Sequence, residues 1–253
     1  MTVLGESNQD FAGVRIMVKK LSSFAIVMAF TVWFASQSQA DILLSWNTFG
    51  NLGTETSEPS VFNDLNVAAA SLTLGAGVTA ATNSHRFGGS NWFNTGDRTA
   101  GSTITQAVTG NDFIQFAVTP NSGFHLTATS LVFSWERSST GPSSLTLRSS
   151  LDGFASDLGA ITGLGTSLTT GNTLNISGVS NVAAATTFRL YGFGGTNALG
   201  TGGFDTNIST TNVIFNGSVT AVPEPTSIAL VSLMCCTGFV AAFRRRIAKS
   251  KIA

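Results

Sequence analysis

Charged residues are scarce in this chain, and lysine is missing from most of it. Only 10% of the 253 residues are charged, well below the ~25% of an ordinary soluble domain. Residues 41–221 contain ten carboxylates, five arginines and no lysine, which gives this segment a net charge of −5. A segment without a basic stripe has no electrostatic footprint for nucleic acid or anionic lipid. We therefore expect neither of them as its partner.

Cysteine is absent from the same segment. Cys235 and Cys236 both lie in an apolar stretch near the C-terminus, where we expect them to be small apolar fillers, with lipidation as the alternative. Exported domains can use disulfides, but residues 41–221 must be held together by their core alone. The segment is long enough, because a domain of ~150 residues already buries roughly 68–70% of its unfolded surface.

Side chains for catalysis or metal binding are also few. A nucleophilic triad needs a histidine base, and the chain has only His85 and His125. No Gly-x-Ser-x-Gly elbow, His-Glu-x-x-His motif or Asp-rich EF-type loop occurs. Glu136 precedes Arg137, so an ion pair or a surface charge is a simpler interpretation than a general acid. We predict no catalytic residues, no metal, no cofactor and no enzymatic activity.

Residues 17–40 have the three parts of a secretory signal peptide. A basic pair is followed by an almost wholly apolar stretch over residues 21–35 and by small residues at Ser38 and Ala40. Cleavage is expected between Ala40 and Asp41. An uncleaved signal anchor is the alternative, but the apolar run is short for a membrane span. The first sixteen residues fit no targeting pattern, so Met17 is the expected start.

The C-terminus, residues 222–253, is predicted to anchor the chain in a membrane. Val222-Pro223-Glu224-Pro225 precedes an apolar stretch over residues 228–243 and then Arg244, Arg245 and Arg246. At 1.5 Å per residue, a helix of ~16 residues is about 25 Å long, just enough for a thin bilayer. One arginine at mid-bilayer costs about 2.5–3.5 kcal/mol, so the arginines stop transfer and stay in the cytoplasm. Both ends of the chain therefore predict that residues 41–221 lie outside the cytoplasm.

This order of Pro-Glu-Pro motif, short apolar span and terminal arginine cluster resembles the PEP-CTERM sorting signal. The resemblance implies recognition by an exosortase, a membrane transpeptidase-like enzyme, and processing near Pro223-Glu224-Pro225. It also implies a Gram-negative host that makes exopolysaccharide. The expected partners are the secretion translocon and the exosortase, with the membrane as a transient anchor. The expected location is the cell surface or the exopolysaccharide matrix.

Residues 41–221 are predicted to form one all-β ectodomain, an antiparallel β-sandwich or jelly roll. Short runs rich in β-branched and aromatic residues alternate with Gly- and Pro-rich turn signals, and no sustained helical period occurs. A short helix is an option only over residues 67–74. The clearest strands are predicted over residues 113–118, 126–135, 144–148, 186–191 and 212–220. Turns are predicted at residues 120–123, 139–142, 152–153, 194–195 and 202–203.

The stretch from Phe113 to Tyr191 also resembles a β-sandwich ectodomain common in PEP-CTERM proteins. The resemblance includes Phe116-Ala-Val-Thr-Pro120 and Leu147-Arg-Ser-Ser-Leu-Asp152-Gly-Phe154. Such domains close with an Ile-Asp-Asn-Val-type strand, and here Thr211 stands at the position of the acid. The resemblance implies a fold and a location, and it implies no reaction.

Two local features leave alternatives open. Asp152 and Asp157 share a loop and could bind Ca²⁺ together with backbone carbonyls, although Asp152-Gly153 is more simply a tight turn. Trp92 and Phe93 lie in a Gly/Asn-rich segment and could form a platform for an extracellular polysaccharide. The alternative is that these rings fill the core, as we expect for Trp46 and Trp135. A carbohydrate-binding module is therefore the second functional hypothesis, with a carbohydrate-active enzyme less favoured.

Overall fold

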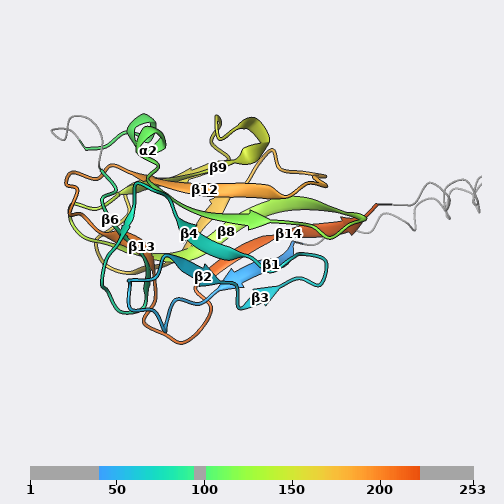
Figure 1. The fold of residues 1–253 in the computed structure, drawn as a ribbon, viewed down its shortest axis with the longest axis horizontal. Coiled ribbons are helices and arrows are strands. Elements are labelled where there is room, and N and C mark those ends of the chain that lie inside the picture. Colours follow the sequence, from blue (N-terminus) through green and yellow to red (C-terminus); the bar gives the residue numbers. More distant parts are fainter. Residues whose placement is uncertain (1–39, 94–100, 223–253) are drawn as a thin grey trace, which may run out of the picture. The chain divides into compact units, whose positions relative to one another are not determined.

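The computed structural model describes residues 40–93 and 101–222 of the chain. These residues form an all-β architecture of two antiparallel sheets, which confirms the predicted sandwich-like fold class (Figure 1). The eight-stranded sheet has the order β3-β1-β14-β8-β13-β6-β5, and β11 also pairs with β8. Its strands are β1 (Asp41–Trp46), β3 (Phe62–Asn63), β5 (Thr79–Ala80), β6 (Arg86–Ser90), β8 (Phe124–Arg137), β11 (Thr169–Asn175), β13 (Gly202–Asp205) and β14 (Val213–Ala221).

The six-stranded sheet has the order β10-β9-β12-β7-β4-β2. Its strands are β2 (Ser57–Pro59), β4 (Ser71–Leu74), β7 (Phe113–Val118), β9 (Ser144–Ser149), β10 (Gly159–Ile161) and β12 (Thr186–Phe193). The strands predicted over residues 113–118, 126–135, 144–148, 186–191 and 212–220 are all present, with ends that move by up to two residues. Leu145 and Leu147 on β9, and Phe188 and Leu190 on β12, are buried as their alternation predicts.

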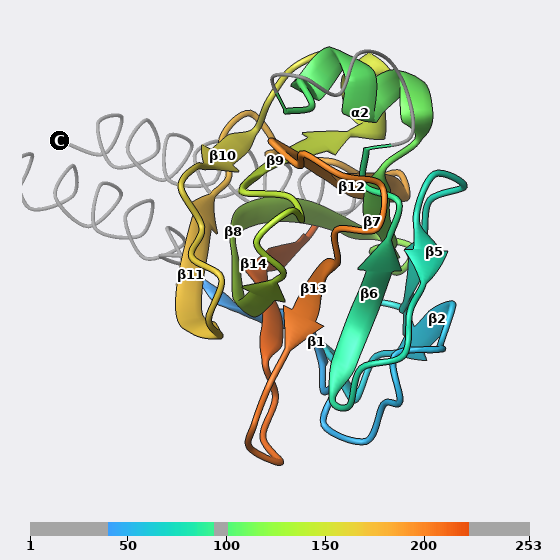
Figure 2. The same ribbon diagram turned by 90° about the vertical axis from the view of Figure 1, so that its left-hand side faces the viewer.

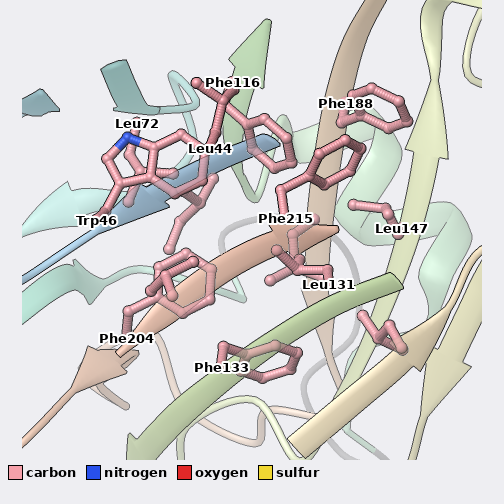
Figure 3. Close-up of a cluster of buried hydrophobic side chains, with 14 of the residues drawn as sticks. Leu44, Trp46, Leu72, Phe116, Leu131, Phe133, Leu147, Phe188, Phe204 and Phe215 are labelled. Carbon is pink, nitrogen blue, oxygen red and sulfur yellow. The ribbon is translucent and has the colours of Figure 1, made fainter. Parts of the chain in front are cut away.

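Aromatic side chains from both sheets form the core between them (Figure 3). Phe215 of β14 packs against Phe116 of β7 and Phe188 of β12, at ring-centroid distances of 5.2 and 4.9 Å. Trp46 of β1 lies 5.1 Å from Phe116, and Trp135 of β8 belongs to the same cluster. The expectation that Trp46 and Trp135 are core residues is therefore confirmed.

The short helix that the sequence left as an option over residues 67–74 does not form. Residues 71–74 form β4, because the alternation of Ser71-Leu-Thr-Leu buries Leu72 against the core, and Val67 makes an isolated bridge to Pro120. The helix of the described residues is α2 (Ile104–Gly110), which lies over the outer face of the six-stranded sheet and packs on Phe113 and Tyr191 (Figure 2). Its start has a Thr103–Gln106 capping box, a signal that the sequence does contain.

The predicted turn at Gly202-Gly203 is also wrong, because both residues lie inside β13 between β8 and β6. The glycines are needed for close packing: a Cβ on Gly203 would lie 2.6 Å from Phe87 O, and one on Gly202 would lie 2.9 Å from the ring of Pro142. In the last strand, β14 changes register against β8 between Asn216 and Gly217.

Candidate functional site

The two ends of the described fold emerge at the same end of the eight-stranded sheet. β1 begins opposite Gly217 of the antiparallel strand β14, and β14 continues only to Ala221, four residues or about 13 Å further along. Ala40 and Asp41, the expected signal-cleavage pair, are exposed there. Val222 is also exposed, and its N–H donates to Gly123 O at 2.8 Å. The predicted signal peptide and the predicted sorting tail therefore connect to the fold close together.

The rest of the predicted sorting signal, Pro223-Glu224-Pro225 and Arg244, Arg245 and Arg246, lies outside the described residues, as does the predicted membrane helix. The same holds for the predicted signal peptide before Ala40 and for Cys235 and Cys236. Within residues 40–93 and 101–222, no helix is long and apolar enough to cross a membrane.

Of the two alternatives for Trp92 and Phe93, the structure supports the core, because both side chains are 0% exposed. The indole N–H of Trp92 donates to the carbonyls of Gly89 and Gly202 at 2.8 and 3.3 Å, and its ring lies 5.9 Å from that of Trp135. Gly192 of β12 leaves space for this large ring, since a Cβ there would lie 2.6 Å from it. Neither ring can serve as a surface platform for a sugar.

The two histidines contact groups that cannot act as nucleophiles. His85 stacks on the ring of Phe49 at 4.4 Å, and its Nδ1 contacts Phe49 O. His125 is the second residue of β8, close to the strand start that the sequence predicted, and its Nδ1 lies 2.5 Å from Asn181 Oδ1. In these contacts, neither histidine faces a serine or cysteine side chain that it could activate.

The Asp152–Asp157 loop is organised by internal hydrogen bonds. The predicted turn is present, since the single-turn 3-10 helix η1 (Ser150–Asp152) ends at Gly153 with a φ of 72°. Hydrogen bonds from the Ser156 side chain and from the backbone N–H groups of Ser156 and Ala155 lower the pKa of Asp152. Asp157 instead pairs with Arg148, at 2.6 Å between Oδ1 and Nε. No group of three potential metal ligands occurs within the described residues.

Glu136 is ion-paired, but Arg86 of β6 is its partner and not the adjacent Arg137. Arg86 lies 3.3 Å from Glu136 and 2.9 Å from Asp205 of β13, so it bridges two carboxylates from neighbouring strands. Burial raises the pKa of Asp205, and the charge of Arg86 opposes that rise. Arg137 donates to backbone carbonyls, including Leu164 O at 2.8 Å. Both arginines therefore hold strands and loops in place.

Sequence reasoning missed a pair of arginines on the outer face of the six-stranded sheet. Arg148 of β9 and Arg189 of β12 are directly opposite each other, and Arg189 is also opposite Gln115 of β7. The guanidinium of Arg189 lies between the rings of Phe113 and Phe154, at 4.3 and 4.0 Å. The outward register of Arg148 and Arg189 follows from the alternation of β9 and β12, but nothing in the sequence indicates that these strands are neighbours.

Comparison with known proteins identifies no relative: no family model, curated protein or solved structure matches the chain.

Proposed function

We propose that this chain is an exported, non-enzymatic protein of the cell surface or the exopolysaccharide matrix, sorted through its C-terminal tail by an exosortase. In this proposal, residues 41–221 form a single jelly-roll-like ectodomain between a cleaved signal peptide and a temporary membrane helix. The order Pro223-Glu224-Pro225, apolar span and Arg244-Arg245-Arg246 motivates the sorting step.

The observation that carries the proposal is the pairing of β1 with β14. During export, a signal peptide still in the membrane and a stop-transfer tail would have to approach the same bilayer. Because β1 starts opposite Gly217 and β14 ends at Ala221, both connections leave one end of the fold. The ectodomain can then complete its sheet outside the membrane while both ends remain attached. A chain with its ends on opposite sides would need a long linker for the same topology.

The exposed ends support processing at both expected positions. Cleavage between Ala40 and Asp41 removes no residue of β1, and cleavage after Val222 removes no residue of β14. Neither event breaks a strand pairing, so we expect the mature ectodomain to be as stable as its precursor.

The test is an export experiment in a host that carries an exosortase. Deletion of residues 223–253 should abolish tail processing and surface retention and release the ectodomain in soluble form. Replacement of Pro223, Glu224 and Pro225 by alanine should leave an unprocessed, membrane-bound precursor. A matched control replaces Thr226 and Ser227, which flank the motif, and should be processed normally. Unchanged processing and surface delivery after the deletion would refute the sorting proposal.

Trp92 and Phe93 do not support a carbohydrate-binding role, because both rings are buried in the core.

A further inference from the structure

Two positive charges face each other on the outer surface of the six-stranded sheet. Arg148 and Arg189 are directly opposite across the β9–β12 pairing, where like charges destabilise a sheet. They are two of only five arginines in residues 41–221, a segment with no lysine and a net charge of −5. Two of the scarce cations of an acidic domain thus lie side by side on this surface.

Only one of these arginines has a carboxylate partner among the described residues. Arg148 pairs with Asp157 and also donates to Phe154 O at 3.1 Å. The salt bridges of residues 40–93 and 101–222 involve Arg86 and Arg148 and leave out Arg189. Arg189 instead donates through Nε to the neutral Gln115 side chain at 3.1 Å. Its charge is therefore not neutralised by a carboxylate of the described fold.

Aromatic rings hold the Arg189 guanidinium in a fixed orientation. Its Cζ lies 4.3 Å from the ring centre of Phe113 and 4.0 Å from that of Phe154, well within the range of a cation–π contact. Nη1 reaches the hydroxyl of Tyr191 at 3.5 Å. A planar guanidinium held by two rings and two hydrogen bonds keeps its remaining Nη N–H groups in place, so a carboxylate can bind them at little entropic cost.

The ring that covers Arg189 is itself held by a strained backbone. Phe154 has a φ of 64°, which is an outlier for a bulky side chain and is therefore strained. Its N–H donates to Ser149 O at 2.8 Å, and its carbonyl accepts from Arg148. Strain of this kind gathers at ligand-binding positions. Phe154 is also partly exposed, so some of its surface is open to solvent.

We propose that the outer surface around Arg189 binds the carboxylate of an acidic polysaccharide. The site comprises Arg148, Arg189 and Gln115 on the sheet, with Phe154 above it, while the hydroxyl of the buried Tyr191 holds Arg189. The guanidinium takes a uronate carboxylate, while the open part of Phe154 packs on the apolar face of a sugar ring. The choice of a polysaccharide over other carboxylates rests on the proposed extracellular location.

The experiment measures binding of the full-length protein, purified in a nonionic detergent, to polygalacturonate at low salt. Arg189→Gln should weaken binding by about tenfold or more, as expected for a lost charge-assisted hydrogen bond. Arg189→Lys keeps the charge but loses the planar fork, and it should also bind more weakly than the native protein. Arg137→Gln is the matched control, because it removes the same charge from β8 in the other sheet. Thermal unfolding of each variant shows whether it is folded under the assay conditions.

Weaker binding in both Arg189 variants, with native-like binding in Arg137→Gln, supports the site. An equal loss of binding in Arg137→Gln and Arg189→Gln means that binding depends on net charge alone, and it overturns the site. Absence of binding to polygalacturonate overturns it as well. Equal binding of poly-glutamate and polygalacturonate overturns the choice of a sugar and assigns the surface to acidic polypeptides. Because the assay needs no export or processing, its failure is distinct from failure of the sorting proposal.

Discussion

Replacing Trp92 by alanine distinguishes a core residue from a sugar platform. The side chain is 0% exposed, touches Trp135, and donates to two backbone carbonyls. A buried tryptophan removes about 150–250 Å² from water, or roughly 4–6 kcal/mol at ~25 cal/mol per Å². Measured aromatic-to-alanine substitutions in cores cost about 3–5 kcal/mol. We therefore expect Trp92→Ala to lower the free energy of unfolding by about 3–5 kcal/mol.

The measurement is urea unfolding of the purified variants, followed by far-UV circular dichroism. In a domain of this size, the expected loss corresponds to roughly 6–20 °C in Tm. Trp92→Phe is the matched variant, because it keeps a ring but leaves the carbonyls of Gly89 and Gly202 without the indole donor. It should cost about 1–3 kcal/mol. If Trp92→Ala unfolds within ~1 kcal/mol of the native protein and instead loses polysaccharide binding, the assignment of Trp92 to the core is wrong.

Three further predictions concern other buried positions. Burial raises the pKa of Glu58, so ionisation of Glu58 opposes folding as the pH rises from its unfolded pKa through its folded pKa. Glu58→Gln should therefore stabilise the protein at pH 7 and not below pH ~4. An equal effect on stability at both pH values would exclude burial of the charge as the cause. Gly203→Ala should destabilise the protein by about 1–3 kcal/mol, because the new Cβ would lie 2.6 Å from Phe87 O. Gly163 has a φ of 72° and open space around it, so Gly163→Ala measures the cost of backbone strain without a clash. Asn212 is buried and bonds Thr48 and the carbonyl of Asp205, so Asn212→Ala should cost about 1–3 kcal/mol in thermal unfolding; an unchanged Tm would show that these hydrogen bonds add nothing.

The strands that sequence analysis located best are those with strong local patterns. Residues 113–118 and 144–148 alternate or cluster apolar residues between clear turn signals, and both became strands close to the predicted bounds. Strands with weak patterns could not be located in this way. β13 reads as a glycine turn in the sequence, yet it lies inside the eight-stranded sheet because its glycines let Phe87 and Pro142 approach the backbone. Close packing of this kind depends on the partner strands.

The candidate sites show the same difference between local and distant information. The placement of Arg148 and Arg189 on the outer face follows from strand alternation, but their direct opposition depends on β12 lying beside β9. Likewise, the ion pairs of Arg86 join residues 50 and 119 positions away in the chain. From local spacing alone, the sequence offered Glu136 either an ion pair with the neighbouring Arg137 or a surface charge, and it could not indicate Arg86.

The sequence by itself determined the all-β class, the strongest strands and the hypothesis of an exported protein with a sorting tail. These conclusions rest on local patterns: alternation, turn residues, apolar runs and terminal charges. Only the tertiary structure decided that Trp92 is buried, that the ends of β1 and β14 lie together, and that two arginines meet on one face of the sheet. The physical reason is that burial and charge proximity depend on which strands pair, and that pairing is set by cooperative packing of distant segments around the shared core.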